Sequence, residues 1–211
     1  MKKYFINIGR QLGSGGKLIG KMLAEELDIP IYDRTLIEMA AKESGFCKEI
    51  FEKNDEEKGI FRSLFDVIPF MSGNLYGSCL SEESLFKIQS DAIRNLSAKG
   101  ACIFVGRCAD YILREEPRCI NIFITADDAD RIVRIRERKP ELSEEQAKTL
   151  MQKADHKRSS YYNYYSGKVW GKAETYDLCI NSSLLGLEGT KNFICHFVKE
   201  FLQNSESEKQ K

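Results

Sequence analysis

The chain has no excess of charge of either sign. Its 211 residues carry 32 Lys and Arg against 32 Asp and Glu, which gives a formal net charge of zero. A protein that coats nucleic acid, or binds a membrane through a polybasic patch, carries a basic excess, so neither partner is indicated. Any site for an anion must therefore be local and built from a few residues.

Long apolar runs are also missing. No run approaches the roughly 18 residues that a membrane-spanning helix needs. The first residues, Met1-Lys2-Lys3, lead directly into a short apolar run and not into the core of a signal peptide. We therefore expect a cytoplasmic protein without a membrane partner, long enough for one α/β domain with a sizeable core.

Cysteine and histidine patterns exclude two further classes of site. The seven cysteines include no Cys-x-x-Cys pair, so neither a disulfide framework nor a zinc site is indicated. The only histidines, His156 and His196, lie far apart and lack the acid and nucleophile context of a catalytic triad. Acyl-transfer chemistry is therefore not supported.

The chain does have a glycine-rich turn near its N-terminus. Gly13-Ser14-Gly15-Gly16-Lys17 follows the apolar run 4–8 and leads into a helical pattern over 16–27. In such a turn successive backbone N–H groups point at an anion, and the helix adds the positive end of its dipole. Lys17 supplies a full charge. This order predicts a phosphate-binding loop, with a flexible turn that binds nothing as the alternative.

The turn matches the P-loop pattern only in part. That pattern has a glycine, four free positions, Gly-Lys and then Ser or Thr, whose hydroxyl binds Mg²⁺. Gly16 and Lys17 fit, but Gln11 stands at the first glycine position and Leu18 at the hydroxyl position. A dinucleotide fingerprint fails, because its third glycine would also fall at Leu18. The pattern therefore predicts anion binding and leaves the metal ligands open.

Short apolar runs alternate with helical patterns along the rest of the chain. Strands are expected over 4–8, 29–32, 101–105, 119–124 and 176–181. Helices are expected over 16–27, 34–44, 81–99, 108–114, 127–139, 143–158 and 187–202. This alternation predicts a parallel sheet with helical crossovers. One domain should cover 1–203, and 204–211 should be a disordered tail because it has no apolar residue.

Polar residues follow several of the expected strands. Asp33 follows the second, Gly106-Arg107 the third, and Thr125 with Asp127 the fourth. Since parallel strands end at the same edge of a sheet, these residues should converge with the glycine loop. The Arg107 guanidinium suits a second phosphate or a carboxylate. An ion pair with a surface acid is the alternative.

The expected helix over 127–139 is rich in arginine. Arg131, Arg134 and Arg138 are three and four residues apart and so share a face. Phosphoryl transfer needs cations around the migrating group, often carried by a segment that closes over it. The next helix starts at Ser143, which with Gln146 has capping-box spacing, and ends in Asp155-His156-Lys157-Arg158. The pattern favours a lid, with a solvated charged face as the alternative.

Aromatic residues gather at 161–165, with Trp170 beyond. A stacking platform for single-stranded nucleic acid is one interpretation. The zero net charge argues against it. We therefore expect these rings to pack the base of the lid against the body of the protein.

Four blocks of sequence, 8–17, 29–37, 105–113 and 176–182, stand in the order found in one known family. Together they resemble the cytidylate kinase-like proteins, a branch of the P-loop nucleoside monophosphate kinases. The resemblance extends from Tyr4 to about Leu202. It implies an α/β P-loop NTPase-type parallel sheet with helices on both faces. It also implies a helical acceptor-binding insert at about 34–99 and a lid at about 139–172.

The same resemblance implies a function and its residues. The donor would be ATP with Mg²⁺, and the acceptor a nucleoside monophosphate, CMP first. Donor phosphates would be bound by Gly13, Ser14, Gly15, Gly16, Lys17 and Leu18. The acceptor would be bound by Asp33, Arg107, Asp110 and Asp155. Catalytic cations would be Lys17, Arg107, Arg131, Arg134 and Arg158. With Leu18 at the hydroxyl position, direct Mg²⁺ ligation by the loop is in question, and Asp33 or Asp127, or waters that they orient, could substitute.

Two other functions fit the same residues. One is a nucleotide-binding sensor or interaction module that has lost catalysis, which the departures at Gln11 and Leu18 allow. The other is a kinase of a different small acceptor, or a sulfuryl transferase, because both use this fold. An assay of ADP release over a panel of monophosphates separates these possibilities.

Overall fold

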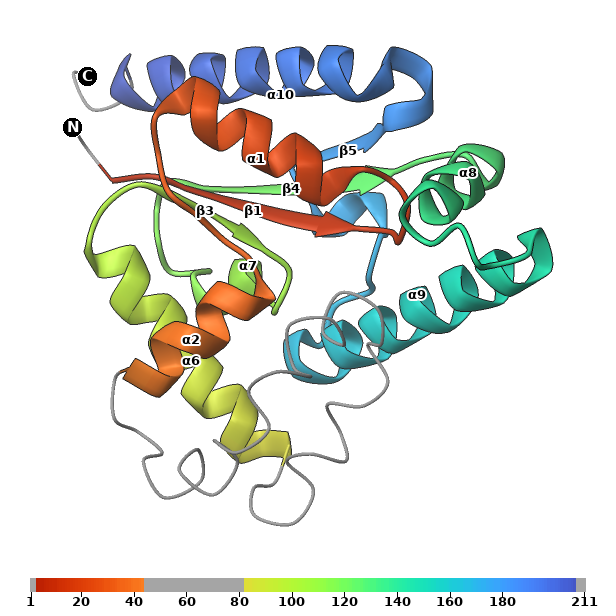
Figure 1. Cartoon of the computed structure of the whole chain (residues 1–211). Coiled ribbons are helices and arrows are strands. Elements are labelled where there is room, and N and C mark those ends of the chain that lie inside the picture. The colour runs from red at the N-terminus through yellow and green to blue at the C-terminus, as the bar shows by residue number, and fades with distance from the viewer. Residues whose placement is uncertain (1–2, 44–81, 208–211) are drawn as a thin grey trace. The chain divides into compact units, whose positions relative to one another are not determined.

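The structure, a computed structural model, describes residues 3–43 and 82–207 (Figure 1). Its strands form one parallel sheet in the order β2-β3-β1-β4-β5. Their bounds are β1 (Phe5–Arg10), β2 (Ile31–Tyr32), β3 (Cys102–Val105), β4 (Cys119–Thr125) and β5 (Leu178–Asn181). The parallel sheet expected from the alternating pattern is confirmed, and the glycine loop leaves its central strand.

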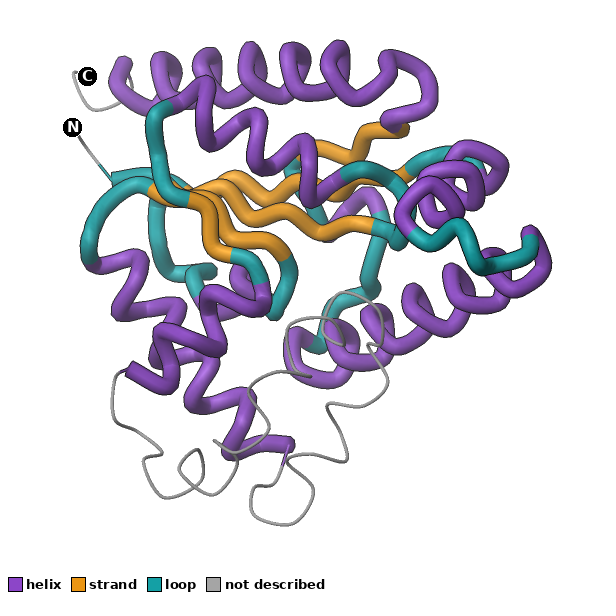
Figure 2. Tube along the Cα trace, in the orientation of Figure 1, coloured by secondary structure: helices purple, strands orange, loops and turns teal. Residues whose placement is uncertain are grey.

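One face of the sheet packs against two helices, α1 (Gly16–Leu27) and α10 (Ser182–Ser207). They lie side by side above the strands (Figures 1 and 2). Ile6 and Ile8 of β1 point to this side and share a buried core with Ile19 and Leu23 of α1. Since side chains alternate along a strand, this face takes every second residue of β1.

The opposite face carries aromatic packing and α7 (Ala109–Ile112), which lies below the strands in Figure 1. The ring centroid of Phe123 in β4 lies 4.9 Å from that of Trp170 and 5.0 Å from that of Tyr176. Gly9 makes room for these rings, because a Cβ atom there would lie 2.8 Å from the Phe123 ring. Trp170 therefore packs on the body as expected, and Tyr162 is buried, whereas Tyr164 is 70% exposed.

Several helix boundaries differ from those expected. The helix α8 (Asp128–Arg138) agrees within a residue, and α9 (Glu144–Ser166) begins with the predicted capping box at Ser143. However, α9 continues eight residues past Arg158. The ring centroids of Tyr161 and Tyr165, one turn apart, lie 4.8 Å from each other in a tilted arrangement, and Gly167 ends the helix in the left-handed conformation. A short 3-10 turn, η2 (Ala173–Thr175), precedes β5.

The last helix, α10, begins at Ser182 and not at 187, and it contains a kink at Gly186. It also runs to Ser207, so the expectation of a disordered tail from 204 is wrong for 204–207. Helix propagation from an already packed segment explains this extension without apolar residues. Residues 208–211 lie outside the part of the chain that the structure describes.

A second compact unit comprises residues 34–99 and contains α2 (Arg34–Glu43) and α6 (Glu82–Ala98), which pack against each other. Its limits coincide with those predicted for the insert. Residues 44–81 lie outside the described ranges, and the acceptor-binding role of this unit stays a prediction.

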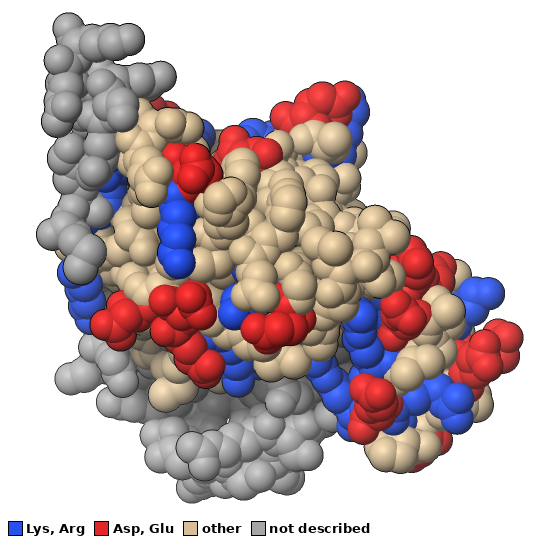
Figure 3. Space-filling model, turned by 90° about the horizontal axis from the view of Figure 1, so that it is seen from above, with Lys and Arg blue, Asp and Glu red and all other residues tan. Residues whose placement is uncertain are grey.

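The surface of the described chain shows mixed charge. On the face seen in Figure 3, Lys and Arg are interspersed with Asp and Glu around a broad uncharged area. Within 3–43 and 82–207, no helix is long and apolar enough to cross a membrane. The predicted absence of a nucleic-acid partner stays a prediction.

Candidate active site

The glycine loop joins the carboxyl end of β1 to the first turn of α1. Gly13 and Gly15 have φ angles of 81° and 79°, in the left-handed region that favours glycine. Space is limiting as well, because a Cβ atom at Gly13 would lie 2.6 Å from the main-chain oxygen of Arg131. The first N–H groups of α1 have no acceptor within the helix. The loop therefore presents backbone donors and the helix dipole together.

Side chains from three other elements donate to the outward-facing carbonyls of this loop. They come from α8, α9 and α10. The bonds are Arg158 Nη1 to Arg10 O at 3.1 Å, Arg131 Nε to Leu12 O at 2.8 Å, Arg134 Nη1 to Gly13 O at 3.3 Å, and Ser182 Oγ to Ser14 O at 2.7 Å. Since a trans peptide points its C=O and N–H in opposite directions, holding the carbonyls of Leu12 and Ser14 on one side turns the N–H groups of Gly13 and Gly15 to the other.

A largely buried ion pair between Arg131 and Asp155 links α8 to α9 beside the loop. Asp155 Oδ1 accepts the N–H of Leu12 at 2.8 Å, and its Oδ2 pairs with Arg131. Arg131 is 3% exposed and also contacts Asp128 at 3.0 Å. The Leu12 side chain packs into the small core between α8 and α9, against Met151 among others. This pair holds both backbone groups of Leu12, and its predicted contacts with substrate stay a prediction.

Lys17 and Asp33 are brought together, as expected for residues that follow strands of one parallel sheet. Lys17 Nζ lies 2.9 Å from Asp33 Oδ2, and the lysine side chain is 42% exposed. Leu18, at the hydroxyl position of the pattern, is 40% exposed and offers no oxygen. Among the described residues, no group of three or more His, Cys, Asp and Glu is placed to hold a metal. Lys17, at the end of the loop, thus has one carboxylate, that of Asp33, beside it.

Arg107 lies in an unusual turn after β3. Gly106, Arg107 and Cys108 all have positive φ, at 79°, 62° and 54°. Such angles are unfavourable for residues with a Cβ atom and cluster at functional sites. The Arg107 guanidinium lies over the ring of Tyr161, 5.3 Å from its centroid. Burial raises the pKa of Tyr161, so the ring under the arginine is a neutral phenol.

Asp110 occupies a more buried position than an acceptor-binding role suggests. It is 6% exposed, and its Oδ2 accepts a 2.6 Å hydrogen bond from the Tyr162 hydroxyl of α9. Burial raises the pKa of Asp110, while the hydrogen bond from Tyr162 opposes that shift. In this structure the carboxylate joins α7 to α9, and its predicted contact with an acceptor stays a prediction.

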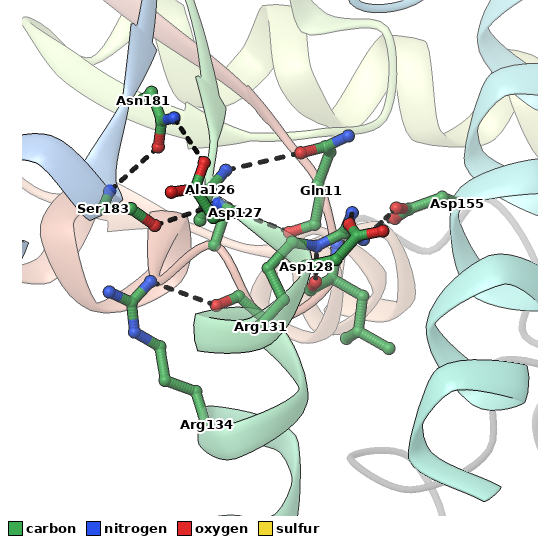
Figure 4. Close-up of polar contacts among 12 residues, drawn as sticks. Gln11, Ala126, Asp127, Asp128, Arg131, Arg134, Asp155, Asn181 and Ser183 are labelled. Carbon is green, nitrogen blue, oxygen red and sulfur yellow. Dashed lines mark hydrogen bonds and ion pairs between the residues drawn. The ribbon is translucent and has the colours of Figure 1, made fainter. Parts of the chain in front are cut away.

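Gln11 has a role that the motif comparison missed. Its side-chain oxygen accepts a hydrogen bond from the Ala126 N–H at 3.4 Å (Figure 4). The backbone N–H of Gln11 donates to the Ile124 carbonyl oxygen at 3.1 Å. A glycine at this position would make only the second of these bonds. The departure from the pattern therefore ties the loop to the end of β4.

Ser182 was also missed, although it directly follows the last expected strand. Around it, Asn181 Nδ2 donates to Asp127 Oδ1 at 2.9 Å, and the Asp127 N–H donates to Ser183 Oγ at 2.9 Å (Figure 4). These bonds fix the start of α10 beside the end of β4. The usable signal was its position, because polar residues at the carboxyl ends of parallel strands line ligand sites.

Comparison with known proteins agrees with this geometry. The model of the cytidylate kinase-like family matches residues 5–184. A crystal structure of an uncharacterized protein from Eubacterium ventriosum is 28% identical and has a TM-score of 0.72, over 93% of this chain and 99% of that one. No curated protein matches the chain.

Two more distant structures share the fold alone. A gluconokinase from Sinorhizobium meliloti is 10% identical with a TM-score of 0.58, over 98% of this chain and 97% of that one. A shikimate kinase from Bacteroides thetaiotaomicron is 14% identical with a TM-score of 0.52, over 94% and 99%. The P-loop NTPase-type sheet predicted from the sequence is thereby confirmed.

Proposed function

The chain belongs to the cytidylate kinase-like family, and on that premise we propose that it transfers the γ-phosphoryl group of ATP to a nucleoside monophosphate, with CMP as the first candidate acceptor. The family and the fold support phosphoryl transfer in general. The observation that carries the proposal is the glycine loop between β1 and α1, where Ser182 holds the Ser14 carbonyl and Lys17 lies beside Asp33 at the start of the helix.

The proposed residues act on the donor phosphates, on the acceptor phosphate or on the migrating group. Lys17 and the loop N–H groups neutralise charge on the donor phosphates, and Arg107 binds the acceptor phosphate through paired hydrogen bonds. Phosphoryl transfer needs little covalent chemistry from the protein, because catalysis comes from positioning and electrostatic stabilisation. The acceptor is already an anion at neutral pH, so no strong general base is required. Arg134 and Arg158, at the rim of the loop, add positive charge near the migrating group.

The residues beside the loop offer only one side-chain oxygen group, the Asp33 carboxylate, as a ligand for Mg²⁺. Kinases of this fold generally use Mg²⁺ that is held by one or two carboxylates, substrate phosphates and water. Asp33 supplies one carboxylate beside Lys17, while Leu18 supplies none. Asp33 would therefore hold the ion together with the phosphates, and bound Mg²⁺ would add positive charge there.

The test is ADP release over CMP, dCMP, UMP and AMP, with shikimate and gluconate added because they are the acceptors in the neighbours' names. Lys17→Ala should lower turnover by about 10²–10³-fold, the loss typical of one transition-state donor. Lys21→Ala is the matched control, because Lys21 is an exposed lysine on the same helix. Turnover of Lys17→Ala equal to that of Lys21→Ala would refute the assignment.

Leu18 supports a second candidate, a nucleotide-binding sensor. Its exposed apolar side chain replaces the hydroxyl through which P-loops ligate Mg²⁺. In the same assay a sensor binds ATP without forming ADP with any acceptor. Restoring the hydroxyl by Leu18→Ser would then create or increase turnover, whereas the kinase assignment requires turnover in the unaltered chain.

A further inference from the structure

We propose that Ser182 is a positioning residue that holds the glycine loop in its anion-binding conformation. The inference rests on the proposed function for its biological meaning, but its physical content concerns only phosphate binding by the loop. Ser182 is the first residue of α10 and follows β5 directly. Its hydroxyl therefore reaches the loop from an element that is distant in sequence.

The Ser182 hydroxyl is buried and has two defined partners. Ser182 and Ser14 are both 0% exposed. Ser182 Oγ lies 2.7 Å from Ser14 O and 3.2 Å from Arg134 Nη1. A guanidinium can only donate, so the serine oxygen accepts from Arg134. The single hydroxyl proton is then directed at the Ser14 carbonyl.

This one bond sets the orientation of the peptide between Ser14 and Gly15. A trans peptide is planar, so a carbonyl held toward Ser182 turns the Gly15 N–H to the opposite side, where an anion would be bound. Gly15 adopts a left-handed conformation with φ of 79°. Because glycine populates positive and negative φ almost equally, the residue itself gives this peptide no preference. The orientation of this peptide is therefore set by a residue outside the loop, and that residue is Ser182.

Arg134 completes the arrangement. Its Nη1 also lies 3.3 Å from the Gly13 carbonyl oxygen, so one guanidinium nitrogen contacts both the loop and Ser182. Charge-assisted donation from Arg134 polarises the serine hydroxyl and strengthens its bond to Ser14. Loss of the hydroxyl would leave the Ser14 carbonyl buried without this donor and would free the peptide to rotate.

The experiment measures the affinity of the full-length protein for two probes, MgATP and inorganic tripolyphosphate, by calorimetry. Tripolyphosphate has no base or sugar and reports on the phosphate site alone. Ser182→Ala should bind both probes about 10- to 100-fold more weakly, the loss expected when a site is misplaced by a fraction of an ångström to an ångström. The fold-loss should be similar for the two probes.

Thr190→Val is the matched control. Thr190 lies on the same helix, is 0% exposed, and its hydroxyl donates to a backbone carbonyl at 2.6 Å, that of Gly186. Removing this hydroxyl also costs stability, but it leaves the loop contacts in place. Its affinity for both probes should stay within about twofold of that of the unaltered protein, as for independent sites.

If Ser182→Ala does not fold, Ser182→Cys takes its place, because a thiol is a weak donor of similar shape. Equal affinities of the folded Ser182 variant and the Thr190 control overturn the inference, as does failure of the unaltered protein to bind tripolyphosphate. A protein that binds both probes but releases no ADP with any acceptor refutes the kinase assignment alone. The role of Ser182 is then still decided by the affinities.

Discussion

Removing the carboxylate of Asp155 should destabilise the protein strongly, because it leaves a buried arginine without its main partner. Arg131 has a side-chain exposure of 4%, against 15% for Asp155. Breaking a buried ion pair from one side costs about 3–5 kcal/mol. The remaining contact with Asp128 reduces this figure to about 2–4 kcal/mol for Asp155→Ala. For a chain of this size the melting temperature should fall by roughly 5–15 °C.

Two further variants separate the contribution of the Asp155 charge from that of the second carboxylate that contacts Arg131. Asp155→Asn keeps an acceptor for the Leu12 N–H but removes the charge that compensates Arg131, so its loss should be smaller, about 1–2 kcal/mol. Asp128→Ala removes the other carboxylate that contacts Arg131, one whose side chain is 67% exposed. Because the Asp128 carboxylate is largely in water, its loss should cost about 0–1 kcal/mol, so this variant is the control.

The assay is urea unfolding followed by circular dichroism, with tripolyphosphate affinity measured on the folded proteins. Asp155→Ala should lose both stability and affinity, because Asp155 and Arg131 hold the N–H and the carbonyl of Leu12 in the loop. Equal losses of stability in Asp155→Ala and Asp128→Ala would refute the reasoning. So would an Asp155→Ala protein that is less stable but binds tripolyphosphate normally, since the pair would then support the fold and not the loop.

Asp110→Asn should raise stability at neutral pH. Burial raises the pKa of Asp110 above its ordinary value of 3.8, so the stability that the protonated acid contributes is lost as the pH rises through the folded-state pKa. Melting temperatures of the variant and the unaltered protein should diverge over that range, and parallel curves would contradict this. Burial also raises the pKa of Cys108 and Cys119 to about 12. Burial raises the pKa of Cys179 as well, but this thiol is exposed, so iodoacetamide at neutral pH should label Cys179 in preference to both, as peptide mass mapping would show.

The strands and the loop were predictable because their signals are local. The apolar run 101–105 is a buried strand of the parallel sheet, and apolar runs identified the strands of the described residues within a few residues, although β2 and β5 are only partly buried. The glycine-rich turn was predictable from its composition and from its place between a strand and a helix. Even the capping box at Ser143 followed from a spacing of three residues.

The supporting contacts were not predictable, because they join residues that are distant in sequence. Arg131 and Arg134 were expected to face phosphate on the strength of their charge and shared helical face. In the structure their guanidinium groups lie against loop carbonyls, a direction that depends on how α8 packs. Periodicity shows which residues share a face but not what that face meets. Ser182 carried no charge or motif, so only its position after β5 marked it.

The two departures from the P-loop pattern differ in their physical consequences. Gln11 replaces a glycine, yet its side chain gains a bond to Ala126, so the first half of the loop is tied more firmly to β4. Leu18 gains nothing comparable, because it is exposed and has no oxygen. Anion binding depends on backbone N–H groups and Lys17, which neither change removes, whereas metal ligation depends on side-chain oxygen. The chain therefore keeps the residues of the phosphate half of the motif, while the side-chain oxygen of the metal half is missing at position 18.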